Sequence, residues 1–463
     1  MIWCLSRYVA RSLSPDSNDL HLTEHDYISS EYTPDTTFIF PSLMATLSAM
    51  IKHDSVEFVH TLVEFTPILP YIVTDYDTIY TCMSNYQDVL QQKNLSCGAV
   101  WCDYGVYHLA KELQIVLPNK FSNIFLGLGG FHMEKIVESI LGKFLVDTGI
   151  SDILVELEIY GPNSVKQVMD GKHYIRSKRG MSLIAECMQT LRLIEFNSIH
   201  CSGIPVSKKD AINLQKLFAS SIYSPSLHTL NQTPSLLINS WNEVNQNLSD
   251  QNFFKNYEKF ISNGKQATQS FNAWSIFLDE IYPILFNLTQ SFRSGDWQLH
   301  ISAVRRAIPL FFSFDHINYA RWAPLYLEHC LSLEKTFPDI YHHYMKGGFV
   351  AKLSKHHGSS LPYDQSLEKA YNKPAKVSGG VIGVTRKKEC MLKYDLTKQE
   401  KEMYVDFLST LSSSSCSDEH DEFNVHYEFN STTTAKDFSH VNSLIDCILS
   451  IRGNPFALPS ATN

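Results

Sequence analysis

Three acidic residues occupy positions that metal-dependent chemistry would need. Asp103 follows the apolar run Ala99–Cys102 and so lies at the end of a predicted buried strand, where α/β folds place their sites. Asp364 and Glu368 are four residues apart and share one face of a predicted helix. Acids that meet from a strand end and a helix are typical of paired divalent metal ions in phosphoryl transfer. Each acid also has a structural interpretation, since Asp103 and Asp364 fit helix N-caps and Glu368 fits a solvated face.

A glycine turn joins a predicted strand to a predicted helix in NIFLGLGGFHMEKIV. A dinucleotide-binding turn needs the pattern G-x-G-x-x-G. Gly127 and Gly129 match its first two positions, but His132 stands in place of the third glycine. The ribose-binding acid and the phosphate-binding Lys-Ser/Thr pair are absent as well. We therefore expect a structural corner in which Gly129 and Gly130 let the strand end pack tightly against the helix, with His132 near the helix start.

Two basic clusters are candidates for contact with phosphate groups. The segment GKHYIRSKRG has glycines at both ends and five side chains that carry or can carry positive charge: Lys172, His173, Arg176, Lys178 and Arg179. The segment TRKKE contributes Arg386, Lys387 and Lys388. A solvated loop is the alternative for both clusters, and we favour it for the second.

Composition limits the functional classes. The chain has 463 residues, of which 44% are hydrophobic and 19% charged, so it can bury a sizeable core. The net charge of -9 argues against a nucleic-acid binder that uses its whole surface, and such contact needs a local patch. The ten cysteines include no C-x-x-C pair, which predicts reduced thiols in an intracellular protein, nuclear or cytoplasmic. No apolar run is long enough to cross a membrane.

The elements that position these residues follow from the spacing of apolar side chains. Two strand–turn–helix units, about two dozen residues apart, predict parallel strands with crossover helices. A long block then follows with the apolar period of helices, and a Ser-, Thr- and acid-rich stretch near the end predicts a disordered linker. The predicted segments are 1–74 (N-terminal helices and loops), 75–149 (strand–helix units), 150–345 (helical block), 346–400 (late strand and acidic helix), 411–436 (linker) and 437–463 (short helix and tail).

Five ordered motifs resemble a large family of uncharacterised, transposon-associated proteins that are common in animal genomes. The motifs are AVWCDYGVYHLAKELQ, NIFLGLGGFHMEKIVESILGKF, GISDILVELEIYGPNSVKQVMDGKHYIRSKRGMSLIAECMQTL, GDWQLHISAVRRAIPLFFSFDHINYARWAPLYL, and GGFVAKL with LPYDQSLEKAYNK. The similarity covers roughly residues 75–386 and the terminal NPF. The family itself is similar to ribonuclease H-like transposases of the DDE/D type that carry a helical insertion.

The resemblance implies an α/β fold, namely an incomplete ribonuclease H-like domain interrupted by a large all-α insertion. It makes Asp103, Asp364 and Glu368 vestigial catalytic acids. If activity survives, Asp103 and Glu368 would bind Mg²⁺ or Mn²⁺, with His132 nearby.

The chain also departs from the family pattern. Tyr104 replaces the usual Gln, and Gly127 replaces what is often Arg. The first strand with its Asp-Asn pair is not found before Met1, which predicts a chain that begins inside the domain.

The expected function is that of a transposon-derived protein that has lost the catalysis of a DNA transposase, with DNA as a candidate partner. The alternative is a nuclear protein–protein interaction module built on the helical insertion. The net charge of -9 favours the interaction module, whereas a basic face beside Asp103 would favour the nuclease lineage. Neither function involves a membrane.

Overall fold

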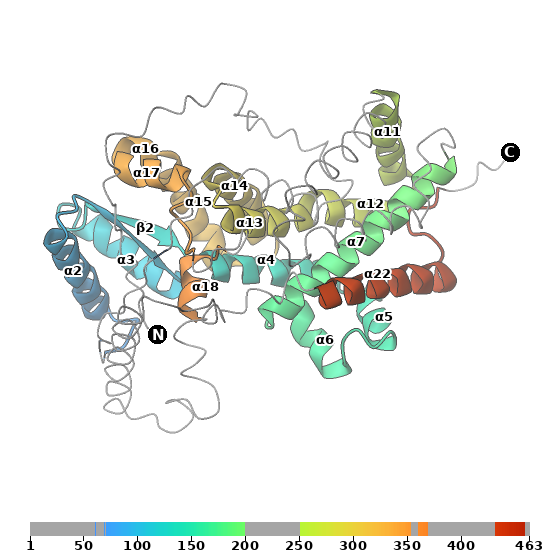
Figure 1. Cartoon of the computed structure of the whole chain (residues 1–463), viewed down its shortest axis with the longest axis horizontal. Coiled ribbons are helices and arrows are strands. Elements are labelled where there is room, and N and C mark those ends of the chain that lie inside the picture. The colour runs from blue at the N-terminus through green and yellow to red at the C-terminus, as the bar shows by residue number, and fades with distance from the viewer. Residues whose placement is uncertain are drawn as a thin grey trace, which may run out of the picture. The chain divides into compact units, whose positions relative to one another are not determined.

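The computed structural model describes residues 61, 69, 71–199, 251–352, 360–368 and 431–458 (Figure 1). These residues form two compact units. Unit 1 takes its described residues from Ser48–Glu134 and Asn287–Phe423, and unit 2 takes them from Lys135–Phe286 and Asn424–Asn463. Each unit is thus assembled from segments that are far apart in the sequence.

Unit 1 contains both strands of the described part of the chain. Strands β1 (Gly98–Cys102) and β2 (Ile124–Leu128) pair in parallel. Helix α3 (Tyr104–Val116) connects them, and α4 (Gly130–Phe144) begins after a single residue beyond β2. These are the two strand–turn–helix units that the sequence predicts.

The prediction of an α/β, ribonuclease H-like fold is wrong. Among the described residues, 73% are helical and 5% lie in strands. The sheet has two strands, and the late segment that was expected to supply another forms a single antiparallel bridge between Ala351 and Leu361. The physical reason is the period of the apolar residues. In most of the described chain they recur as in helices, so few segments can pair with β1 or β2.

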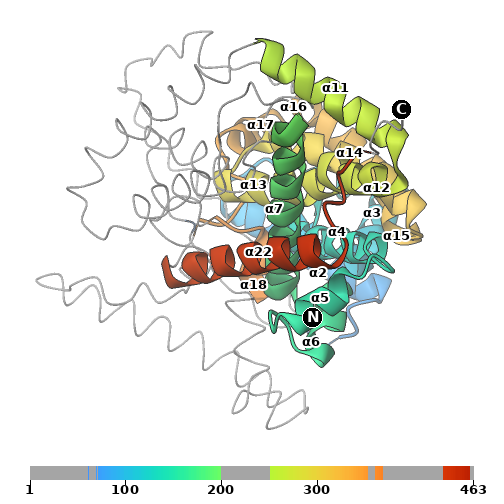
Figure 2. The same ribbon diagram turned by 90° about the vertical axis from the view of Figure 1, so that its right-hand side faces the viewer.

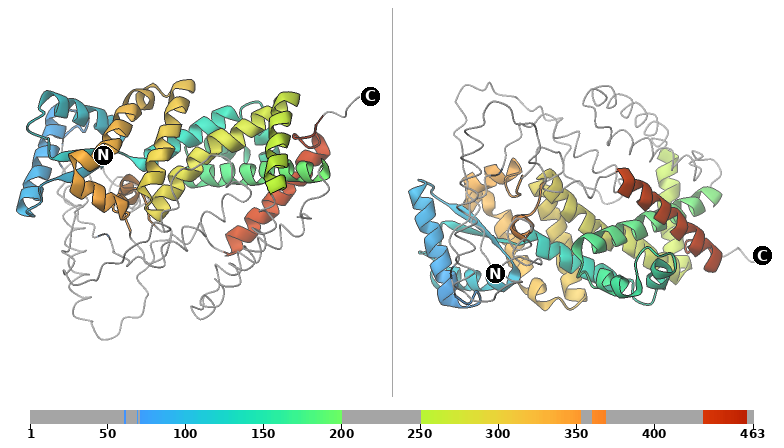
Figure 3. Two further views of the ribbon diagram at one scale, coloured as in Figure 1. Left: turned by 90° about the horizontal axis from the view of Figure 1, so that it is seen from above. Right: turned by 60° about the horizontal axis from the view of Figure 1, so that its bottom comes forward.

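Helices cover this short sheet in unit 1 (Figure 3). The others that lie wholly in the unit are α2 (Tyr76–Gln92), α14 (Trp297–Ser313), α15 (Ile317–Leu331), α16 (Leu333–Thr336), α17 (Pro338–Met345) and α18 (Tyr363–Leu367). Helices α3, α15 and α18 contact the strands, while α14 and α15 pack on each other as a helical hairpin.

Trp101 of β1 is the centre of the unit 1 core. Its indole Nε1 donates a hydrogen bond of 2.8 Å to the hydroxyl of Tyr344. In the paired strand it lies opposite Gly127, where a Cβ would come within 2.4 Å of the indole. Its ring centroid lies 6.0 to 6.4 Å from those of four residues of α14, α15 and α17: Trp297, His300, Tyr326 and Tyr344. Packing around Trp101 therefore explains why Gly127 has no side chain.

Unit 2 is helical. Its helices are α5 (Ile150–Glu156), α6 (Pro162–Met169), α7 (Tyr174–Ile199), α11 (Gln251–Ala267), α12 (Gln269–Ile276), the π-helical turn η1 (Phe277–Ile281) and α22 (Ser431–Ile451). Helices α4 and α13 (Tyr282–Ser294) contain the boundaries between the units. Helix α22 crosses α7, as Figure 2 shows, and an ion pair of 2.5 Å between Arg179 and Asp437 joins the two helices.

Several sequence-based predictions fall outside the described residues. They concern residues 1–60, 62–68 and 70, residues 200–250 of the predicted helical block, most of the predicted segment 346–400, the second basic cluster, residues 411–430 of the predicted linker and residues 459–463 of the predicted tail. The rest of that linker overlaps the start of α22. Among the described helices, none is both long and apolar enough to cross a membrane.

Candidate functional site

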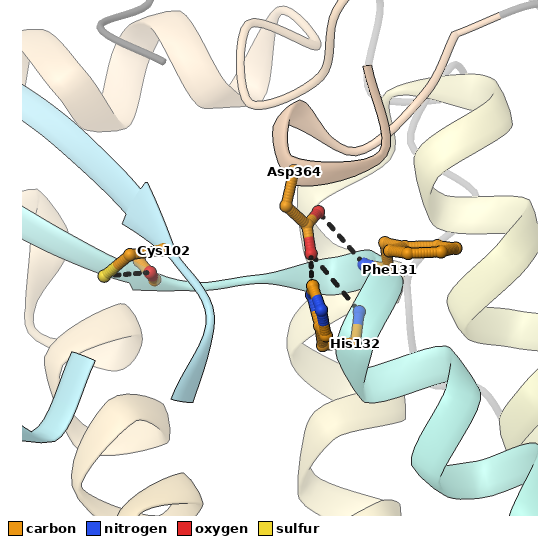
Figure 4. A network of polar contacts seen from close by, with 5 residues as sticks. Cys102, Phe131, His132 and Asp364 are labelled. Atoms are coloured by element: carbon orange, nitrogen blue, oxygen red, sulfur yellow. Dashed lines mark hydrogen bonds and ion pairs between the residues drawn. The ribbon is translucent and has the colours of Figure 1, made fainter. Parts of the chain in front are cut away.

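The glycine turn after β2 brings a carboxylate to the start of α4 (Figure 4). A Cβ on Gly129 would lie 2.5 Å from Oδ2 of Asp364. A Cβ on Gly130 would lie 2.2 Å from the ring of Phe292. Both glycines therefore allow close approach of another side chain, which is the structural corner that the sequence predicts.

Asp364 caps the N-terminus of α4 from a distant part of the chain. Its Oδ1 accepts a hydrogen bond from the amide of Phe131 at 3.1 Å, and its Oδ2 accepts one from the amide of His132 at 3.2 Å. The first amides of a helix have no partner within the helix, and the helix dipole favours a negative charge there. The N-cap of its own helix, α18, is Pro362. Asp364 is therefore a helix cap, as its structural interpretation predicts, but the helix that it caps is α4 and not its own helix, α18.

His132 is held by the same carboxylate. Its Nδ1 lies 3.0 Å from Oδ2 of Asp364, so the protonated Nδ1 donates to that oxygen. The His132 side chain is 41% exposed, whereas that of Asp364 is 9% exposed. An imidazole oriented by a carboxylate has the geometry of a general base. A reaction would also need an activated nucleophile or a bound substrate beside it.

Asp103 approaches this pair from the end of β1. It occupies the N-cap position of α3, but its side chain forms no capping hydrogen bond. Its Oδ1 is buried without a hydrogen-bond partner among the described residues. Burial raises the pKa of Asp103, His132 and the backbone amide of Val106 lower it, and the charge of Asp364 raises it. The structure thus brings Asp103, His132 and Asp364 to one edge of the sheet.

The neighbouring nucleophile candidates are not activated. The thiol of Cys102 is buried and lies 4.0 Å from the carbonyl oxygen of Gly127 (Figure 4). Burial raises the pKa of Cys102 well above its usual range, and the carboxylates of Asp103 and Asp364 add to the effect. The same causes raise the pKa of the buried Tyr319 hydroxyl. Both groups therefore stay protonated near neutral pH and are poor nucleophiles.

The donor set at this edge does not fit the paired-metal centre that the resemblance implies. Both oxygens of Asp364 already accept hydrogen bonds from protein groups. Glu368 lies one turn further along, at the C-cap of α18, and is half-buried. Within the described ranges, no group of three or more His, Cys, Asp or Glu side chains is arranged to hold a metal ion. The geometry instead assigns Asp364 to the packing of α18 on α4.

The first basic cluster lies at the start of α7, and much of its charge is used within unit 2. Lys172 forms an ion pair of 2.8 Å with Asp170, and Arg179 pairs with Asp437 of α22. The ammonium group of Lys178 lies 4.3 Å from the ring centroid of Tyr174. His173 and Arg176 are exposed. The cluster therefore offers few cations to phosphate groups, although sequence reasoning selected all five residues.

A second candidate site, which sequence reasoning missed, is an open groove on the α14–α15 hairpin. It has a volume of about 380 Å³. Its lining is largely apolar and consists of Ile308, Pro324, Leu327, Glu328, Leu331, Ser332 and Lys335. Leu331 is 54% exposed, and Phe312 and Ile317 on the same hairpin are 61% and 64% exposed. We call this feature the α14–α15 groove.

A signal for the groove exists in the sequence. The stretch RRAIPLFFSFDHINYARWAPLYLEHCL is apolar around more of each helix than one buried face requires. Pro309 and Pro324 lie inside helices, where they interrupt the hydrogen-bond ladder. Such a wide apolar surface predicts an additional contact, but the sequence alone does not indicate which side chains remain exposed.

The fold and these sites define a largely helical protein that has a two-stranded parallel sheet, a carboxylate-capped helix and an apolar interhelical groove. The chain belongs to the family described as Domain of unknown function (DUF8702), whose model matches residues 47–462. No curated protein and no solved structure matches it.

Proposed function

We propose that this protein is a binding module that holds a helical segment of a partner protein in the α14–α15 groove. The observation that carries the proposal is the largely apolar lining of the groove, which includes the exposed Leu331. Phe312 and Ile317 add exposed apolar surface elsewhere on the same hairpin. An amphipathic helix that lays its apolar face into such a groove is a common mode of peptide recognition. Exposed apolar patches on soluble proteins often mark such sites.

The buried residues beneath the groove support a rigid binding surface. Ala323, Tyr326 and Cys330 face the core from α15, and Ala307 and Phe311 do so from α14. The Tyr326 hydroxyl forms a hydrogen bond of 2.9 Å with Nε2 of the buried His300. A preorganised surface loses little conformational entropy on binding, which favours affinity.

An intracellular location, nuclear or cytoplasmic, is part of the proposal. The six cysteines among the described residues are free thiols. Free thiols persist in reducing compartments.

Transposon descent with loss of catalysis remains a second proposal. The order of five motifs supports the descent, and the use of Asp364 as a helix cap supports the loss of catalysis. This second proposal assigns an origin to the chain, so it is compatible with a present role in protein binding.

A displayed library of amphipathic helical peptides tests the binding function. The affinity of peptides selected on the wild-type protein is then measured for the Leu331→Glu and Ile451→Glu variants. Ile451 lies in unit 2 and serves as the control, because its side chain is also 54% exposed. We expect peptides whose affinity falls at least about tenfold in Leu331→Glu and is unchanged in Ile451→Glu, because a charge in the groove must be desolvated. A selection that yields no peptide sensitive to Leu331→Glu would overturn the proposal.

A further inference from the structure

Basic side chains lie in the lining of the α14–α15 groove and one helical turn from it. Arg305 lies one turn before Ile308 on the same face of α14, and Arg321 lies one turn before Pro324 on α15. Both arginines are exposed, and Lys335 lines the groove itself. Within the part of the chain that the structure describes, none of these three cations forms an ion pair. Their charges are therefore available to a molecule in the groove.

Glu328 is the acid among the residues that line the groove. The negative charge of Glu328 favours the protonated form of the buried Lys111 of α3. The ammonium group of Lys111 donates a hydrogen bond of 2.8 Å to Gln114. Burial lowers the pKa of Lys111 to about 8, and the charge of Glu328 opposes that change. His329 also approaches Glu328 at 3.4 Å, but burial lowers the pKa of His329, which keeps its ring neutral at pH 7. The three cations Arg305, Arg321 and Lys335 outnumber Glu328, so the surface around the groove has a net positive charge.

This local charge is opposite in sign to that of the whole chain, which has a net charge of -9. We propose that the partner segment is an amphipathic helix with acidic side chains on both flanks of its apolar face. The inference rests on the proposed function, because it names the chemistry of the partner at the same groove. Complementary charge of this kind speeds association and excludes partners of the wrong sign.

The apolar lining of the groove favours an acidic protein segment over other polyanions as the partner. Ile308, Leu327 and Leu331 offer apolar surface, which a protein helix can match with its own apolar side chains. A nucleic acid presents phosphates on its outside and contacts proteins mainly through charge, with steep dependence on salt. Binding of a nucleic acid duplex in preference to the peptide is thus an outcome that would contradict the inference.

The test uses a peptide from the library that is sensitive to Leu331→Glu, and two variants of it. In one variant the flanking acids are replaced by Gln, and in the other by Lys. We expect the acidic peptide to bind at least about tenfold more tightly than the Lys variant at 50 mM salt, with a smaller difference at 500 mM. The Gln variant should fall between them. A 20-base-pair duplex is measured in parallel and should bind more weakly than the acidic peptide.

Variants of the protein test whether the arginines near the groove attract the acidic peptide. Arg305→Gln with Arg321→Gln should weaken binding of the acidic peptide about three- to tenfold and leave the Gln peptide nearly unchanged. Arg176→Gln removes an exposed arginine of α7, outside the groove lining, and should change the binding of neither peptide. If all three peptides bind equally, or if the Lys peptide binds best, the inference is overturned while the proposed function stands. If no peptide is sensitive to Leu331→Glu, both fail.

Discussion

Two acids at one sheet edge have opposite effects on stability. Asp364 is bonded to two helix amides and an imidazole, so Asp364→Asn should destabilise the folded state by about 1–3 kcal/mol, as expected for loss of a charged cap. The Oδ1 of Asp103 is buried without a hydrogen-bond partner among the residues that the structure describes, and burial raises the pKa of this carboxyl. Its ionised form is therefore destabilising, and Asp103→Asn should leave stability unchanged or raise it at pH 7.

The pH dependence separates the two effects. When folding raises the pKa of a carboxyl, the protein loses stability as the pH rises from the unfolded-state pKa to the folded-state pKa of that group. The gain from Asp103→Asn should therefore shrink as the pH falls towards the ordinary Asp pKa of about 4. Chemical denaturation at pH 4 and pH 7 measures both variants. A large loss of stability for Asp103→Asn at pH 7 would show that this side chain, too, has a stabilising partner.

His300 makes the protein sensitive to acid. Burial lowers its pKa to about 3, whereas unfolded histidine titrates near 6.5. Between these values the unfolded chain binds the proton and the folded chain does not, so stability falls as the pH drops below about 6.5. From pH 7.5 to pH 4.5, wild type should lose about 2–3 kcal/mol more than His300→Gln. His342→Gln, at an exposed histidine of α17, should retain the wild-type pH dependence.

At the scale of elements, the sequence predicts local pairs well and distant contacts poorly. The strand–turn–helix units and the corner at Gly129 depend on neighbouring residues, and the prediction of both is confirmed. The capping of α4 joins residues 232 and 233 positions apart, and no local pattern shows that Asp364 reaches it. The resemblance placed the same residue in a catalytic set, because strand-end and helix acids look alike in sequence whether they bind metal or amides.

The chain end after α22 is a second distant contact with a measurable effect. Phe456 is fully buried against Phe271 of α12, and the Asn454 side chain donates to the carbonyl of Leu191 in α7 at 2.9 Å. Phe456→Ala should reduce the free energy of unfolding by about 3 kcal/mol, because it leaves a cavity. Leu449→Ala, at a side chain that is 39% exposed, should cost much less. Equal losses for the two variants would mean that Phe456 is not packed as described.

At the scale of the whole molecule, the arrangement of helices could not be derived from the sequence. Apolar periodicity locates most helices, but it does not give the side on which each one packs. Trp101 illustrates the difference, because its neighbours come from α14, α15 and α17, about 200 residues further along the chain. The α14–α15 groove likewise exists only once both helices are placed. The α/β fold that the resemblance implies is therefore wrong, and the described residues form a largely helical structure.

The charge of the whole molecule bears on its affinity for DNA. With a net charge of -9, and with Lys172 and Arg179 paired to Asp170 and Asp437, the chain should bind a 20-base-pair duplex more weakly than non-specific DNA-binding proteins, which reach roughly 1–100 µM. Asp170→Asn with Asp437→Asn frees both cations and should strengthen binding at low salt, measured by fluorescence anisotropy.

The matched control for that experiment changes charge without freeing a cation of the cluster. Asp152→Asn with Asp339→Asn, at two exposed acids of α5 and α17, raises the net charge by the same amount. If the start of α7 is a latent phosphate-binding surface, freeing its cations with the Asp170 and Asp437 substitutions should strengthen DNA binding more than this control does. The affinity should then also depend more steeply on salt. Equal effects would assign the change to net charge alone. Low-micromolar binding by the wild-type chain at 150 mM salt would contradict the prediction and restore a nucleic-acid role for this cluster.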